Sequence, residues 1–97
     1  MDKQLESLKA AAREYIQGIS YDDIIAIARD LPQCAAPSIK SEVVQIVSRA
    51  ISGDKASMKK LSNFFLEHAD NLVDSGCSEE SFMSFAHAVF WEDKSAG

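Results

Sequence analysis

The stretch Ser75–Phe82, SGCSEESF, marks a junction between two helices. Gly76 stands where a helix ends, because glycine readily adopts the left-handed backbone of a C-terminal cap. Ser78 stands where the next helix begins, as an N-cap residue. Glu79 and Glu80 follow in its first turn, where the helix dipole favours negative charge. These residues predict a helical hairpin centred on Gly76.

Cys77 within this stretch raises the alternative of a reactive site. A cysteine nucleophile needs a lowered pKa and a base within reach. The two glutamates that follow Cys77 would raise its pKa, and His87 lies roughly 15 Å further along the same predicted helix. Cys77 and Phe82 instead stand at the two positions of a hydrophobic staple. We therefore expect no catalytic role for Cys77, and the chain is not expected to be an enzyme.

Helical spacing of apolar residues continues on both sides of the junction. It predicts one helix over about 55–75, and a second from Ser78 through Phe90 that ends in a frayed tail at about 93–97. Three earlier helices are predicted over about 3–17, 21–31 and 37–52. Ser20 and Asp54 are predicted N-caps, and Gly53 is a predicted helix end. No segment alternates as a strand does, so the chain is expected to be a compact all-α single domain, 1–97, of about five helices.

The composition of the 97 residues is that of an ordinary globular domain, with 46% hydrophobic and 26% charged residues. No apolar run of signal-peptide or membrane-spanning length occurs, so we expect a cytoplasmic protein without membrane contact. Cys34 and Cys77 are then expected to be free thiols. Together with His68 and His87 they match no common zinc spacing. No metal or cofactor is therefore expected.

The two histidines are predicted to be structural. His68 shares the apolar face of the helix over about 55–75, which predicts a buried, hydrogen-bonded core histidine. His87 lies on the flank of the last helix, at the expected edge of the core.

Direct nucleic-acid binding is not expected. Residues 22–31 and 38–51 have the general look of a helix-turn-helix, but the connection PQCAAP is too long and has no glycine. The second of these helices offers only Lys40 and Arg49 as cations, and the chain as a whole is acidic.

Negative charge is concentrated late in the chain. Residues 61–97 hold seven Asp or Glu and one Lys, whereas residues 1–60 hold eight Asp or Glu and nine Lys or Arg. Glu67, Asp70 and Asp74 are spaced i, i+3 and i+7, so they lie on one helix face, with Asn71 beside them. This pattern is typical of a solvated face that improves solubility. It is also what an interface with a basic partner requires.

The second interpretation predicts a partner-binding surface whose apolar anchor would be an exposed aromatic residue. Its predicted members are Glu67, Asp70, Asn71, Asp74, Glu79, Glu80 and Trp91. In size, charge and helical class the chain resembles bacterial immunity proteins and antitoxins. That resemblance implies a monomer that forms a 1:1 complex with a basic protein, such as a nuclease toxin, and occludes its active site. The alternative is a helical adaptor or regulatory subunit that binds its partner through an apolar groove, with Phe64 or Trp91 as the sensitive residue.

Overall fold

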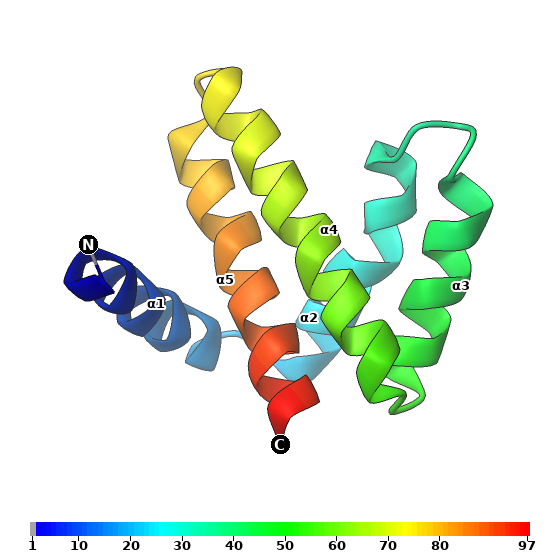
Figure 1. Ribbon diagram of the computed structural model, residues 1–97, viewed down its shortest axis with the longest axis horizontal. Helices are drawn as coiled ribbons and strands as arrows, with labels where there is room; N and C mark the ends of the chain where they lie inside the picture. Colours follow the sequence, from blue (N-terminus) through cyan, green and yellow to red (C-terminus); the bar gives the residue numbers. More distant parts are fainter. Residues whose placement is uncertain (1) are drawn as a thin grey trace.

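The computed structural model describes residues 2–97, with the side chains of Asp2 and Cys34 outside the description. It is all-α, as predicted, with five α-helices and one short 3-10 helix, η1 (Figure 1). Their bounds are α1 Asp2–Gln17, α2 Tyr21–Asp30, η1 Leu31–Cys34, α3 Lys40–Ile51, α4 Lys55–Asp74 and α5 Ser78–Ala96. α1 packs against α5, while α3 packs against α4 and against the α2–η1 segment. The α4–α5 hairpin therefore forms the centre of the molecule.

Buried serine hydroxyl groups join the two helices of this hairpin. Ser62 Oγ donates to the carbonyl oxygen of Ala88 at 2.7 Å, from α4 to α5. In the opposite direction, Ser81 Oγ donates to Ala69 at 2.7 Å and Ser84 Oγ donates to Phe65 at 2.8 Å. Small side chains at these positions let the helix backbones approach closely, and the carbonyl acceptors satisfy the buried hydroxyl groups. The spacing of apolar residues does not predict these contacts.

A glycine ends α3 and another ends α4, as predicted. Gly76 has φ +83° and Gly53 has φ +107°, both in the left-handed region. After α4, the N–H of Cys77 bonds to the carbonyl oxygen of Leu72 at 2.8 Å, and that of Gly76 bonds to Val73 at 3.0 Å. This pair of bonds is a Schellman motif. The same pattern follows α3 around Gly53.

The N-caps were predicted correctly at two helices and wrongly at one. The Ser20 side chain accepts from the N–H of Asp23, and the Asp54 carboxylate accepts from both the N–H and the hydroxyl group of Ser57. The N-cap of α5, however, is Cys77, which makes no side-chain capping bond. Because Cys77 is itself the cap, it does not occupy the staple position that precedes a cap. Ser78 is the first residue of α5.

Two helix bounds also differ from the prediction. α3 begins at Lys40 and not at Pro37, because Ile39 has non-helical backbone angles. α5 stays helical to Ala96, where a frayed tail was predicted. Contacts with other helices hold this last turn: Asp93 accepts from Arg13 of α1 at 2.8 Å, and Lys94 Nζ lies 5.1 Å from the centre of the Tyr21 ring.

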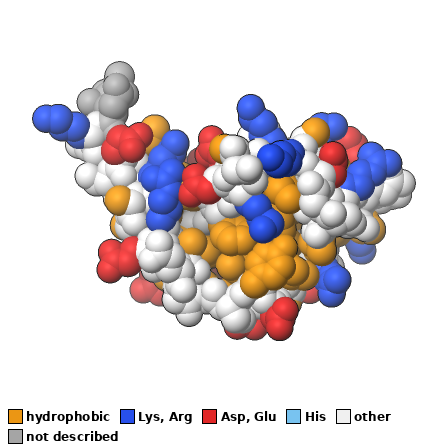
Figure 2. Space-filling model, turned by 90° about the horizontal axis from the view of Figure 1, so that it is seen from below, with side chains coloured by type: hydrophobic (Ala, Val, Ile, Leu, Met, Phe, Trp, Pro, Cys, Tyr) orange, Lys and Arg blue, Asp and Glu red, His pale blue; other side chains and the backbone are white. Residues whose placement is uncertain are grey.

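The core lies between the hairpin and the helices on either side of it. Its largest fully buried side chains are Trp91, Leu61, His87 and Val43. At the end of the molecule that contains the C-terminus, hydrophobic side chains gather near the centre of the surface, with both basic and acidic side chains around them (Figure 2).

Candidate functional site

The acidic residues predicted on α4 lie on its solvent face. Glu67, Asp70 and Asp74 are all exposed. The core contacts of the same helix include Leu61 and Phe65, which by helical geometry point to the opposite side. We call Glu67, Asp70 and Asp74 the acidic face of α4. Since no basic side chain within residues 2–97 forms an ion pair with them, their charge is directed to solvent.

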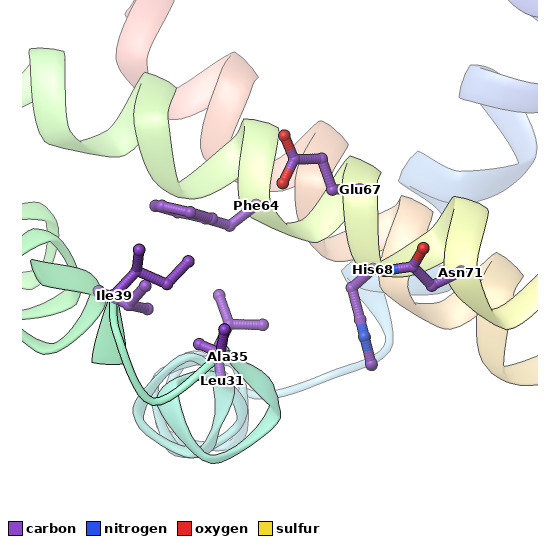
Figure 3. A pocket seen from close by; sticks show the side chains of 9 residues that line it. Leu31, Ala35, Ile39, Phe64, Glu67, His68 and Asn71 are labelled. Carbon is purple, nitrogen blue, oxygen red and sulfur yellow. The ribbon is translucent and has the colours of Figure 1, made fainter. Parts of the chain in front are cut away.

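A shallow groove runs along one edge of this face. It has a volume of about 160 Å³ and lies between α4 and the segment that connects η1 to α3. Its lining is Leu31, Ala35, Ala36, Ile39, Val43, Phe64, Glu67, His68 and Asn71. We call it the Phe64 groove. Figure 3 shows the Phe64 ring extending toward Ile39, whereas the Glu67 carboxylate points away from Leu31 and Ala35. The groove thus has an apolar floor and a carboxylate at its border.

A more polar hollow lies on the other side of Phe64, between α3 and α4. It has a volume of about 200 Å³, shares Phe64 and Glu67 with the groove and adds Glu42, Ile46, Lys60 and Asn63. Its charged side chains are therefore two carboxylates and one ammonium group. Together the two hollows place one half-buried aromatic ring beside carboxylates of two helices.

The structure brings some of the predicted binding residues together and separates others. Glu67 and Asn71 both line the Phe64 groove, and Asp70 and Asp74 share the exposed side of α4. Glu79 is exposed in the first turn of α5. Glu80, also exposed, borders a different cavity, between α2, α4 and α5. Glu80 therefore does not share a hollow with Glu67.

Trp91 corrects the prediction of an exposed anchor. It is 0% exposed, and its ring meets Phe90 edge to face, with centroids 5.2 Å apart. The indole belongs to the hydrophobic core and is not available to a partner. Phe64, which is half-buried, is the aromatic residue of the groove beside the acidic face of α4.

The positions of the two histidines are the reverse of those predicted. His68 is only half-buried and lines both the Phe64 groove and the cavity beside Glu80. His87 is fully enclosed, at 2% exposure. The spacing of apolar residues does not reveal which flank of α4 is left uncovered by α2, and that flank decides the exposure of His68.

No hydrogen bond joins the Cys77 thiol to a base among the described side chains. Cys77 is a free, half-buried thiol, and the side chain of Cys34 lies outside the described part of the structure. Among the described side chains, no three His, Cys, Asp or Glu residues come together as metal ligands.

Within residues 2–97, no helix has both the length and the apolar character of a transmembrane span.

Comparison with known proteins finds no matching family model, curated protein or solved structure.

Proposed function

We propose that this protein is a non-catalytic binding module that holds a basic partner protein against the acidic face of α4. The observation that carries the proposal is the position of the Phe64 groove directly beside that face, with Glu67 belonging to both. Protein interfaces commonly combine an aromatic anchor with a charged rim. Here Phe64 supplies the anchor, while Glu67, Asp70 and Asp74 supply the charge.

The acidic face of α4 and the Phe64 groove would contribute to binding in different ways. Exposed carboxylates attract a cationic partner over distances of about one Debye length, roughly 8–10 Å at physiological salt, and so accelerate association. Apolar contacts in a groove resist dissociation, because they remove hydrophobic surface from water. Asn71, at the groove, offers an amide that donates and accepts hydrogen bonds.

The partner class that we propose is a cationic nuclease toxin, with this chain as its cytoplasmic immunity protein or antitoxin in a bacterial cell. A nuclease cleft presents Lys and Arg side chains to phosphate groups. A row of carboxylates three and four residues apart can occupy such a cleft in place of those phosphates. The complex would be 1:1, and inhibition would be steric as well as electrostatic.

The second candidate function is a helical adaptor or regulatory subunit. The apolar lining of the groove by Leu31, Ile39 and Phe64 favours this alternative. In that case the acidic face only keeps the protein soluble. The two functions differ in how the affinity depends on salt concentration, because only the first relies on charge.

The test compares two double charge reversals of equal size. Asp70→Lys/Asp74→Lys alters the acidic face, while Glu14→Lys/Asp30→Lys alters exposed carboxylates on α1 and α2. The partner is first captured from the source cell and eluted with a salt gradient. We then expect the α4 reversal to weaken its affinity by at least tenfold and to flatten the salt dependence, whereas the control reversal changes the affinity far less.

Equal effects of the two reversals would contradict the use of the acidic face. Unchanged affinity in both variants, combined with a loss of binding on Phe64→Ala, would establish the adaptor function instead. A captured basic partner is then assayed for nuclease activity with and without this protein.

A further inference from the structure

A hollow between the α2–η1 segment and α3 shares no lining residue with the Phe64 groove. It has a volume of about 350 Å³. Its apolar lining is Pro32, Val44, Val47 and Ile51, and Arg29 and two serines complete it. We call it the α2–α3 hollow. Val44 is 49% exposed, so the hollow presents apolar surface to solvent.

Arg29 gives the α2–α3 hollow a positive charge. Its side chain is exposed, and neither Asp nor Glu belongs to the lining. Among the described side chains the ion pair is that of Arg13 with Asp93, so within residues 2–97 no carboxylate pairs with Arg29. A guanidinium group beside branched apolar side chains suits an apolar group that carries a carboxylate next to it.

The C-terminal end of α4 presents an apolar side chain of this kind. Val73 is 59% exposed, and Asp70 and Asp74 beside it are exposed as well. Because helix positions three apart have Cβ atoms about 5–6 Å from each other, Asp70 and Val73 are neighbours on the surface. We call Asp70, Val73 and Asp74 the Val73 knob. The turn that follows it forms a corner of the molecule, at the end of the α4–α5 hairpin away from the C-terminus (Figure 1).

We propose that a second copy of this chain docks its Val73 knob in the α2–α3 hollow. Val73 and Val44 are the two most exposed large hydrophobic side chains of the described residues, and this contact would remove both from water. A carboxylate of the knob, from Asp70 or Asp74, would pair with Arg29. The two surfaces are thus complementary in charge and in apolar character.

The knob and the hollow belong to different helices, so one copy can use both at once. Such an interface is heterologous, and it adds copies head to tail unless a ring closes. Because the contact is small, we expect weak association, with a dissociation constant on the order of 1 mM. The inference does not rest on the proposed function. Since Asp70 and Asp74 also belong to the acidic face, a basic partner bound there would compete with the second copy.

The first test follows the wild-type protein as its concentration rises from micromolar to millimolar. Amide shifts of the ¹⁵N-labelled chain report the contact, and the rotational correlation time reports the size of the assembly. We expect the amides of Arg29, Val44 and Val73 to shift together as the correlation time increases. Added salt should reduce both changes, because it screens the ion pair.

Two substitutions then separate the knob from the hollow. Val73→Gln removes the apolar tip of the knob and leaves the hollow intact, whereas Arg29→Glu reverses the charge of the hollow and leaves the knob intact. Both side chains are exposed, so the fold should tolerate the changes. Each variant alone should associate at least threefold more weakly than the wild type. An equal mixture of the two should form a 1:1 dimer that grows no further, because one intact knob meets one intact hollow.

Met83→Gln is the matched control for Val73→Gln. Met83 is 41% exposed on α5 and belongs to neither the knob nor the hollow, so its replacement should leave the association unchanged.

The proposal is overturned if the amide shifts and the correlation time of the wild-type protein stay constant up to millimolar concentration, a result that needs no variant to fold. A mixture of the two variants that associates no better than either alone would also contradict it, since a heterologous contact must be restored by mixing. Equal weakening by Met83→Gln and Val73→Gln would place the contact elsewhere.

Discussion

The burial of His87 makes the stability of the protein depend on pH. Burial holds its pKa below the usual value, so the unfolded chain takes up a proton at higher pH than the folded protein does. Between the folded pKa and about 6.5, the unfolded state binds more protons, and the free energy of unfolding therefore falls as the pH falls. At pH above about 7 both states carry a neutral imidazole, and this contribution to stability is fully present.

Replacing His87 by Phe should remove this pH dependence. We expect the wild-type protein to lose stability between pH 7 and pH 5 more steeply than His87→Phe does. At pH 7 the variant should be as stable as the wild type or more stable by about 1 kcal/mol, since it no longer buries an unsatisfied polar group. Urea unfolding followed by circular dichroism at several pH values measures both effects. Parallel pH profiles would show that the imidazole is not the group responsible.

At the scale of elements, the glycine turn of the α4–α5 hairpin sets how its helices meet. A Cβ atom at Gly76 would meet nothing within 4 Å, so a substitution there acts through the backbone conformation alone. Gly76→Ala should lower the free energy of unfolding by about 1–2 kcal/mol, the cost of a left-handed backbone for an L-residue. Thermal or urea unfolding provides the measurement.

Gly18→Ala is the matched control for this prediction. Gly18 does not have a positive φ, and its nearest atom to an added Cβ is the Tyr15 carbonyl oxygen at 3.5 Å, an ordinary contact. Alanine restricts the unfolded chain more than glycine does, so this variant should be as stable as the wild type or slightly more stable. Equal destabilisation of both variants would mean that the turn conformation is not the cause.

The sequence predicted those features of the elements that depend on near neighbours. Gly76, Gly53, Ser20 and Asp54 end or begin helices through bonds within a few residues, so a single segment contains the whole signal. At the start of α5 the prediction was wrong by one residue, because the N-cap is Cys77 and not Ser78.

The groove and the buried groups could not be predicted in the same way. Ile39 and Phe64 meet only because α3 packs on α4, and helical spacing does not reveal which flank of a helix faces its neighbour. The burial of Trp91 in the hydrophobic core is likewise a property of the packed helices and not of the spacing along α5. The spacing of the acidic residues predicted that they cluster on one side of α4. The apolar groove beside them could be recognised only from the tertiary structure.

At the scale of the whole molecule, α1 is the peripheral helix. It packs on α5, while its exposed Leu5 and Leu8 lie toward the end that extends away from the other helices (Figure 1). Arg13 anchors it through two hydrogen bonds to Asp93, at 2.8 and 3.1 Å. The pair is exposed to solvent, so salt screens it. Local opening of α1 should therefore need less free energy than opening of the α4–α5 hairpin.

Hydrogen exchange should show this hierarchy. We expect amides of α1 to exchange first and those of α4 and α5 last, with the Ser62, Ser81 and Ser84 neighbourhood best protected. Asp93→Asn should accelerate exchange in α1 selectively, because it weakens the charged contact with Arg13. Mass spectrometry of peptic fragments resolves the individual helices. A uniform increase across all helices would mean that the ion pair stabilises the entire fold.

The pairing of α1 with α5 also affects how the protein folds during translation. Arg13 and Asp93 are 80 positions apart, whereas the hairpin partners Ser84 and Phe65 are 19 apart. A ribosome completes α1 long before it makes the surface on which α1 docks. Throughout that interval the apolar residues of the α1 segment have no surface to cover them. The nascent chain is therefore open to chaperone binding until α5 leaves the exit tunnel.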